Sequence, residues 1–310
     1  MSTRNRELQE IIDGLSGRQK QISPKYFYDE RGSQLFDEIT RLPEYYLTNT
    51  EISIMRNNVN EMAECIGRQA SLIEFGSGSS IKTRILLEHL SELAAYVPVD
   101  ISVELLLESA SFLREDFPQI EVLTVVADFT KKFQLPTPRI MPLRNVVYFP
   151  GSTIGNFEHP VATELLRVMY HEAGDGGALL IGVDLQKNSQ VIEDAYNDSA
   201  GVTAAFNLNV LRHLNHAYGA NFNLDNFEHS ANYDKDGGRV VLELVSQDDQ
   251  AIEIGTAKFY IARGETILTE YSHKYTLDGF AGLADEAGFE VARVWTDESR
   301  LFSVQFLTRD

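Results

Sequence analysis

The chain has 310 residues, of which 43% are hydrophobic and 24% charged, as in a compact globular protein of one large or two moderate domains. It carries 46 acidic and 27 basic residues, and the formal net charge of -19 repels nucleic acid phosphates and anionic lipid surfaces. We therefore expect neither nucleic acid nor a membrane as a partner. The single cysteine, Cys65, excludes an intrachain disulfide and fits the reducing cytoplasm. The amino-terminal stretch MSTRNRELQEIIDGL has no unbroken apolar run, so we predict no signal peptide and no membrane anchor.

Residues 1 to about 60 are rich in aromatic side chains and have helical spacing of apolar positions. From about residue 71 to 185, short apolar runs alternate with helical patterns. The runs predicted as strands are SLIEF, YVPVD, EVLTVVAD, NVVYFPGS and ALLIGVDL. The segments predicted as helices are KTRILLEHLSELA, SVELLLESASFLREDF and PVATELLRVMYHEA. This alternation predicts a doubly wound α/β domain, whose ligands bind at the carboxyl ends of the strands.

The second half of the chain has a different pattern. Residues 188–220 predict two helices broken near Gly201, and the segments after DKDGG, namely RVVLELVS, AIEIGTAKFYI and ETILTEYSHKYT, alternate as antiparallel strands. A helix over LDGFAGLADEAGF and two strands, EVARVWTD and LFSVQFLTR, then return to the first sheet as a closing hairpin. We infer one domain over 61–187 plus 281–310 and a second, discontinuous α+β domain over 1–60 plus 188–280.

A glycine-containing turn, Gly76-Ser77-Gly78, follows the strand that ends at Glu74 and Phe75. Glycine lets the backbone approach a ligand that a β-carbon would push away. A Walker phosphate loop does not fit, because Lys82 and the threonine after it lack the required spacing. A dinucleotide fingerprint requires a third glycine where position 81 is Ile. S-adenosylmethionine, which has no pyrophosphate, requires only a short glycine turn near its amino acid end, so this pattern favours a methyltransferase.

Two acidic residues at the ends of the following strands complete the predicted cofactor site. Asp100 ends YVPVD, where a carboxylate would accept hydrogen bonds from the ribose hydroxyls, and Asp128 ends EVLTVVAD, where it would meet the adenine amino group. The alternative is that each aspartate only caps the next helix. We also place Lys82, at the start of the helix after the turn, among the cofactor-binding residues. The first domain is thus predicted to be a Rossmann-like S-adenosylmethionine-dependent methyltransferase domain, with S-adenosylhomocysteine as its product.

Several long motifs resemble one family over nearly the whole chain and in the same order. They are PKYFYDERGSQLFDEITRLPEYYLT, IEFGSGSSIKTRILLEHL, FPGSTIGNF, DAYNDSAGVTAAFNLNVL and LTEYSHKY. These motifs are similar to those of the histidine-specific N-alpha methyltransferases of ergothioneine biosynthesis. The resemblance implies a substrate-binding second domain and three successive methyl transfers to the α-amino group of histidine, which give N,N,N-trimethylhistidine (hercynine).

The resemblance also assigns roles to particular side chains. Contacts with the amino and carboxylate groups of histidine fall on Tyr28, Asn156 and Tyr196. Contacts with the imidazole ring fall on Tyr45, Glu270 and Ser272. These types suit the task independently, because amides and phenols donate to a carboxylate and an imidazole N–H requires an acceptor.

Each assignment has a structural alternative. Asn156 could close the turn before the next helix, and the tyrosines could be core aromatics with hydrogen-bonded hydroxyls. Glu270 and Ser272 alternate along a strand and share one face, which for an isolated strand is usually the solvated one.

The chain departs from the family pattern at three positions beside the expected imidazole pocket. Leu47 stands where proline is usual, His273 where cysteine is frequent, and Leu242 where a methionine lies beside the pocket. These departures bear on the shape of the side-chain pocket, so an amine acceptor other than histidine stays open.

The reaction requires mainly that a deprotonated amine be held in line with the sulfonium methyl group. Water or a phenol oxygen such as that of Tyr28 can accept the proton, and we assign Tyr28 as the catalytic residue. His213 and His216 have helical spacing but no accompanying ligand cluster, so we predict no metal. The alternatives are the same fold acting on another amino acid or aromatic amine, and a non-catalytic S-adenosylmethionine-binding subunit. We expect a monomer acting on a small-molecule amino acid.

Overall fold

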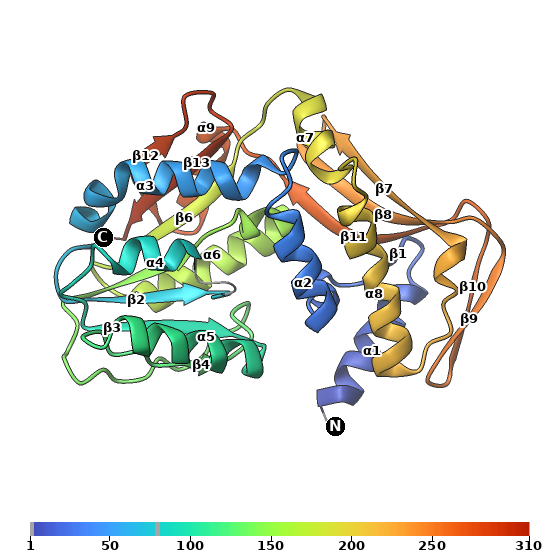
Figure 1. Cartoon of the computed structure of the whole chain (residues 1–310), viewed down its shortest axis with the longest axis horizontal. Coiled ribbons are helices and arrows are strands. Elements are labelled where there is room, and N and C mark those ends of the chain that lie inside the picture. Colours follow the sequence, from blue (N-terminus) through green and yellow to red (C-terminus); the bar gives the residue numbers. More distant parts are fainter. Residues whose placement is uncertain (1–2, 78–80, 310) are drawn as a thin grey trace. The chain divides into compact units, whose positions relative to one another are not determined.

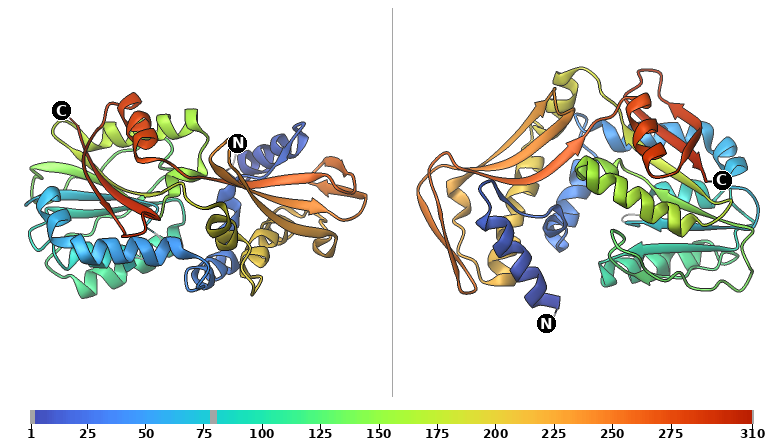
Figure 2. Two further views of the ribbon diagram at one scale, coloured as in Figure 1. Left: turned by 90° about the horizontal axis from the view of Figure 1, so that it is seen from above. Right: turned by 180° about the vertical axis from the view of Figure 1, so that it is seen from behind.

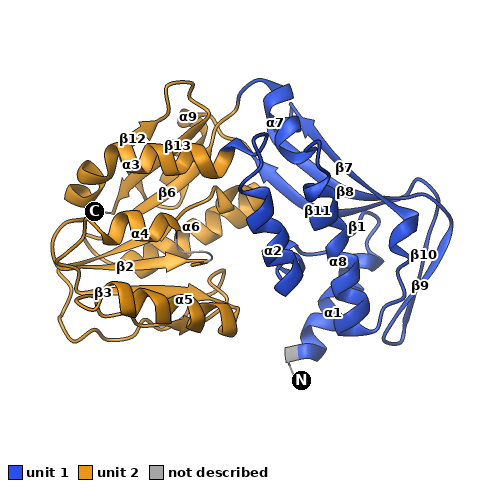
Figure 3. Cartoon of the chain, in the orientation of Figure 1, with its two compact units in different colours: residues 1–46, 187–273 blue, residues 47–186, 274–310 orange. Residues whose placement is uncertain are grey.

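The computed structural model describes residues 3–77 and 81–309 (Figure 1). The chain forms two compact units, coloured separately in Figure 3: unit 1 comprises residues 1–46 and 187–273, and unit 2 comprises residues 47–186 and 274–310. The sequence placed these boundaries after residues 60, 187 and 280. The long helix α3 (Tyr46–Ile66) accounts for the first difference, because nearly all of it belongs to unit 2. That the units act as methyltransferase and substrate-binding domains stays a prediction.

Unit 2 is built on a seven-stranded sheet with the order β12-β13-β6-β5-β2-β3-β4. Its strands are β2 (Ala70–Phe75), β3 (Ala95–Asp100), β4 (Val125–Val126), β5 (Arg144–Phe149), β6 (Ala178–Asp184), β12 (Glu290–Thr296) and β13 (Phe302–Thr308). The strands from β6 to β4 pair in parallel, and β13 pairs antiparallel with both β6 and β12. The carboxyl-terminal hairpin thus closes the sheet, as the sequence predicted.

Helices cover both faces of this sheet. They are α3, α4 (Ile81–Leu87), α5 (Val103–Asp116), α6 (His159–Ala173) and α9 (Leu277–Glu286). The views in Figure 2 show α6 and α9 on one face and α3 and α5 on the other. Every residue of β2 and of β6 is buried, which explains why these strands are continuous apolar runs. The two-face coverage confirms the predicted Rossmann-like α/β fold.

The order in which strands are added to this sheet reverses at β2. The strand that follows β2 along the chain, β3, pairs on one side of it, and β5 pairs on the other. In open α/β sheets such a topological switch point leaves a crevice outside the carboxyl ends of the strands, where ligands bind. The loops that follow β2 and β5 are therefore the parts of unit 2 in which a cofactor site is expected.

Unit 1 combines a four-stranded sheet, ordered β1-β11-β8-β7, with a separate hairpin of β9 and β10. The strands are β1 (Lys20–Gln21), β7 (Phe227–Asp234), β8 (Arg239–Ser246), β9 (Gln250–Ile254), β10 (Ala257–Ile261) and β11 (Thr266–His273). The helices are α1 (Thr3–Ser16), α2 (Glu30–Ile39), α7 (Ser189–Tyr196) and α8 (Val202–Tyr218), with short 3-10 turns at Pro24–Phe27 and Leu224–Asn226. Phe206 of α8 stacks on Phe27, with ring centroids 4.6 Å apart, and so packs α8 against the 3-10 turn at Pro24–Phe27.

Three predicted elements differ from the structure. The helix predicted over residues 82–94 ends at Leu87, and of the strand predicted over 121–128 only β4 forms. The segment AIEIGTAKFYI, predicted as one strand, is divided at Gly255 between β9 and β10, which pair as a hairpin. Strand β7 was not predicted at all. Within the described residues, no helix is both long and apolar enough to cross a membrane.

Candidate active site

The turn after β2 has the backbone geometry that requires glycine. Gly76 has a φ of +73°, in the left-handed region that L side chains rarely adopt, and its N–H donates to the Val99 carbonyl at 2.8 Å. Ser77 is buried, and Gly78 lies outside the described residues. Because Phe75 pairs with Val99, the turn lies directly beside Asp100 at the end of β3. The structure therefore brings the predicted cofactor turn and the predicted ribose carboxylate together.

Beneath this turn, Glu74 is a buried carboxyl group to which the sequence assigned no role. Its Oε2 accepts hydrogen bonds from Thr83 Oγ1 at 2.6 Å and from the Tyr96 hydroxyl at 2.5 Å. Burial raises the pKa of Glu74 to about 7, against the lowering effect of these two bonds and of the Lys82 charge. Glu74 thus fixes the first turn of α4 to β2 and β3 from below.

The two predicted aspartates are held by local hydrogen bonds. Asp100 Oδ1 accepts a hydrogen bond from the Ser102 N–H at 2.9 Å. This bond closes a turn before α5, and the N-cap of α5 is Ser102 rather than Asp100. Asp128 accepts from the Thr130 N–H and hydroxyl and from Lys131 Nζ. Partial burial raises the pKa of Asp128, but the hydrogen bonds from Lys131 and Thr130 outweigh it and hold the pKa below its usual value. Asp128 is therefore a half-buried anion beyond the end of β4, and its adenine contact stays a prediction.

Lys82 is held by a carboxylate that the sequence did not single out. Its Nζ lies 2.6 Å from Oε2 of Glu51, a residue of α3 that is 1% exposed. The same carboxylate accepts the Gly151 N–H, which lies 3.0 Å from each of its oxygens. The first turn of α4 and the loop after β5 are thus tied to one buried group.

The loop after β5 carries Asn156 at the end of a 3-10 turn, Thr153–Asn156. Gly151 and Ser152 both have positive φ values, +81° and +56°, and Ser152 Oγ accepts the Asp184 N–H at 2.9 Å. Left-handed backbone at a residue other than glycine is uncommon and tends to occur at functional sites. Glu158, and not Asn156, is the N-cap of α6, and the substrate contact of Asn156 stays a prediction.

In unit 1, four of the predicted substrate residues lie together. The Tyr196 hydroxyl and Ser272 Oγ are 2.8 Å apart, and the Tyr45 and Tyr196 rings meet edge to face at 6.2 Å. The ring of Phe36 contacts the rings of both Tyr45 and Tyr28, so a continuous row of aromatic rings leads from Tyr196 to Tyr28. Tyr28 is 44% exposed. Burial of Tyr45 and Tyr196 and the hydrogen bond between the Tyr196 hydroxyl and Ser272 also fit the alternative of core aromatics with hydrogen-bonded hydroxyls, so the substrate contacts of these two tyrosines stay predictions.

A β-bulge sets the direction of Glu270. Strand β11 shifts register between Leu268 and Glu270, so Leu268 lies opposite Glu243 whereas Glu270 lies opposite Leu242. Directly opposed residues point to the same side of a sheet, and a bulge redirects the side chains that follow it. Glu270 and Ser272 therefore share the face on which β8 buries Leu242, rather than the solvated face.

Behind Tyr196 lies a histidine whose protonation state follows from its partners. Asn207 Nδ2 donates to the Glu243 carbonyl at 3.0 Å, which fixes the orientation of its amide, and the same nitrogen lies 2.8 Å from His229 Nδ1. His229 Nδ1 must then accept, and Nε2–H donates to the Tyr196 carbonyl at 2.9 Å. Burial lowers the pKa of His229, in agreement with a neutral ring. His229 thus holds the end of α7, where Tyr196 stands.

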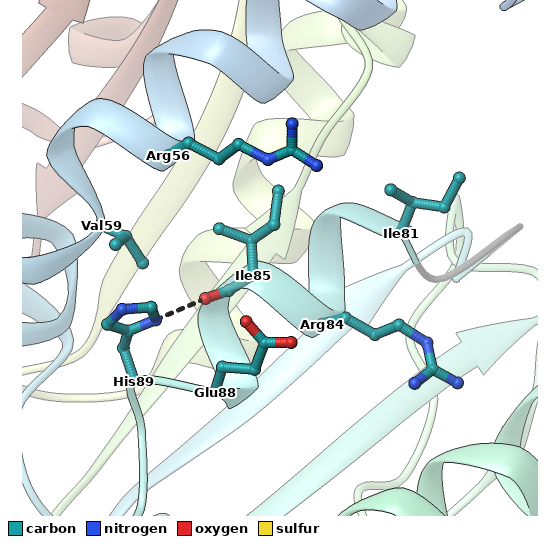
Figure 4. Close-up of a pocket in the computed structure, with 7 residues that line it drawn as sticks. All are labelled: Arg56, Val59, Ile81, Arg84, Ile85, Glu88 and His89. Atoms are coloured by element: carbon teal, nitrogen blue, oxygen red, sulfur yellow. Dashed lines mark hydrogen bonds between the residues drawn. The ribbon is translucent and has the colours of Figure 1, made fainter.

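A cavity of about 320 Å³ opens between α3 and α4 on unit 2 (Figure 4). It is lined by Arg56, Val59, Ile81, Arg84, Ile85, Glu88 and His89. None of the residues predicted to bind cofactor or substrate lines it. Among the described residues, no group of three or more histidine, cysteine or acidic side chains is arranged to hold a metal ion, and His213 instead contacts the Tyr26 carbonyl through Nδ1.

Comparison with solved structures defines the class of protein. A crystal structure of a S-adenosylmethionine-dependent methyltransferase from Clostridium acetobutylicum aligns with 90% of this chain and 98% of its own, with a TM-score of 0.52 at 9% identity. The fold is that of the S-adenosylmethionine-dependent methyltransferases, and S-adenosylmethionine is the methyl donor.

The family follows from the sequence relatives. Residues 7–309 match the family described as histidine-specific, SAM-dependent methyltransferases, and the chain belongs to that family. The histidine N-alpha-methyltransferase of Mycolicibacterium smegmatis is 36% identical, over 97% of this chain and 94% of its own. That of Mycobacterium tuberculosis is 34% identical with the same coverage. Ergothioneine biosynthesis protein 1 of Neurospora crassa is 31% identical over 89% of this chain but only 32% of its own length.

Proposed function

We propose that this enzyme transfers three methyl groups from S-adenosylmethionine to the α-amino group of L-histidine, giving N,N,N-trimethylhistidine (hercynine) for ergothioneine biosynthesis. The names of the relatives in Mycolicibacterium smegmatis and Mycobacterium tuberculosis support histidine as the acceptor. The name of the Neurospora crassa relative supports the pathway.

One observation carries the choice of histidine: the bulge in β11 turns Glu270 toward the same buried face as Ser272. Glu270 supplies a half-buried carboxylate and Ser272 a buried hydroxyl, and an imidazole offers one ring N–H that a carboxylate can accept and a second ring nitrogen to which a hydroxyl can donate. Glu270 and Ser272 would bind the two ring nitrogens, with Tyr45 beside the ring. Tyr28, Asn156 and Tyr196 would bind the amino and carboxylate groups.

Catalysis would depend on placement of the amine. In each transfer the neutral nitrogen donates its lone pair to the sulfonium methyl carbon, and the C–S bond breaks with its electrons remaining on sulfur as S-adenosylhomocysteine leaves. The nitrogen must be deprotonated before each attack, and water or the partly exposed Tyr28 hydroxyl would accept that proton. After the third transfer the α-nitrogen is a quaternary ammonium with neither a proton to lose nor a lone pair, so no fourth transfer follows. We also propose a cytoplasmic location, where a chain with a single cysteine and no possible intrachain disulfide fits the reducing conditions.

The decisive experiment is to incubate the purified protein with S-adenosylmethionine and each free amino acid in turn and to weigh the products. We expect a mass gain of three methyl groups on histidine alone. A gain on another amine but none on histidine would replace this proposal with a same-fold N-methyltransferase for that acceptor. Binding of the cofactor with no transfer to any amine would favour a non-catalytic subunit.

A further inference from the structure

The buried carboxylate of Glu51 connects three segments at the switch point of the unit 2 sheet. It stands on α3, its Oε2 lies 2.6 Å from Lys82 Nζ on α4, and both its oxygens lie 3.0 Å from the Gly151 N–H after β5. A carboxylate that is 1% exposed is stable only when it is paired and hydrogen-bonded. Glu51 meets this condition through Lys82 of α4 and Gly151 of the loop after β5, both beside the predicted cofactor site.

The surrounding backbone is shaped to admit this carboxylate. A β-carbon at Gly182 of β6 would lie 2.2 Å from Glu51 Oε1, so any larger residue there would displace the carboxylate from its present position. At Gly151 the φ of +81° turns the N–H toward Glu51, and a β-carbon there would lie 3.2 Å from Lys82 Nζ. The arrangement is therefore a specific site for a charge in the interior rather than a chance contact.

The ion pair with Glu51 leaves part of the Lys82 side chain accessible to a ligand. Its side chain is 20% exposed, and an ammonium group has three N–H donors, of which Glu51 uses one. Lys82 is the second residue of α4, four positions after Gly78 of the glycine turn. The amino acid end of S-adenosylmethionine bears a carboxylate, which an ammonium held at this place would attract.

We propose that Glu51 is a positioning residue for the methyl donor: it holds the Lys82 ammonium and the Gly151 amide in one geometry, so that α4 and the β5 loop bind the amino acid end of the cofactor together. Glu51 acts through Lys82 and Gly151 and touches no reacting atom. The proposal rests on the cofactor and not on the identity of the acceptor.

Glu51→Gln tests this, because glutamine keeps the size and an acceptor for the Gly151 N–H but removes the charge that holds Lys82. Calorimetry on the full chain would compare S-adenosylhomocysteine with 5′-methylthioadenosine, which has the same adenosine but no amino acid end. We expect a loss of about tenfold in affinity for S-adenosylhomocysteine, the size of one charge-assisted hydrogen bond, and a change below about twofold for methylthioadenosine.

Lys82→Met is the matched control. It should reproduce the selective loss, and Glu51→Gln added to it should cost no further affinity, since the two residues act as one unit. Equal losses for both ligands, or unchanged binding of S-adenosylhomocysteine, would overturn the proposal. So would a full additional loss in the double variant. If Glu51→Gln does not fold, Glu51→Asp, which keeps the charge but is too short to reach both partners, provides the same contrast. Histidine takes no part in this assay, so its outcome is independent of the proposed acceptor.

Discussion

Glu74→Gln is expected to change how the stability of unit 2 depends on pH. The pKa of Glu74 is about 7 in the folded protein and about 4.5 when the chain is unfolded, because burial disfavours its charge. The folded state therefore binds the proton more tightly, so the contribution of Glu74 to stability is full below pH 4.5 and is lost as pH rises through 7. At about 1.4 kcal/mol per pH unit, the loss is about 3 kcal/mol.

Glutamine removes this titration while its carbonyl can still accept from Thr83 and Tyr96. Urea unfolding at several pH values should show the variant gaining about 3 kcal/mol relative to the wild type between pH 4.5 and 8. Glu115→Gln, at an exposed position of α5, is the control for removal of one carboxylate. The reasoning fails if the two variants show the same pH dependence, or if carbon-13 titration gives Glu74 an ordinary glutamate pKa.

Three further predictions concern ligand binding. Glu270→Ala should weaken histidine binding by about 10- to 100-fold and leave S-adenosylmethionine binding nearly unchanged; equal losses by calorimetry would contradict its role. Asp100→Ala should lower the affinity for S-adenosylmethionine more than the affinity for histidine, and an unchanged affinity for S-adenosylmethionine would show that Asp100 does not bind the ribose. His229→Ala should raise the Kd for histidine several-fold by releasing Tyr196, without affecting the cofactor; in combination with Tyr196→Phe the losses should be less than additive, and simple additivity would count against this coupling.

The sequence predicted the elements of this fold where both faces of a strand or one face of a helix are buried. Strands β2 and β6 are continuous apolar runs because helices cover them on both sides. The errors at β4 and β7 lie at sheet edges. Strand β7 ends its sheet and carries polar residues without clean alternation, and β4 ends the other sheet after two residues. Edge strands avoid apolar runs that would invite pairing with other chains, so their sequences resemble loops.

The site was predicted less completely than the fold, and Glu51 shows why. It falls on the buried face of α3, four residues after Leu47 and three before Ile54, so a charge on an apolar stripe was a visible signal. Its partners Lys82 and Gly151 lie 31 and 100 positions further along the chain, and only the folded sheet brings them together. The direction of Glu270 likewise depends on a bulge at Thr269, for which the sequence offers no glycine or other marker.

The predicted division of roles between the two units would explain why the cofactor was easier to infer than the acceptor. The fold recurs at 9% identity in the Clostridium acetobutylicum enzyme, so the same backbone arrangement forms from very different sequences. A sheet of this kind therefore identifies a methyl donor but cannot select an acceptor. In our proposal the acceptor is selected by side chains such as Glu270, Ser272 and Tyr196, whose placement in unit 1 depends on one bulge and on one neutral histidine behind the end of α7. Changes of acceptor within such a family should accordingly arise from substitutions on this face of β8 and β11, with the glycine turn and its carboxylates retained.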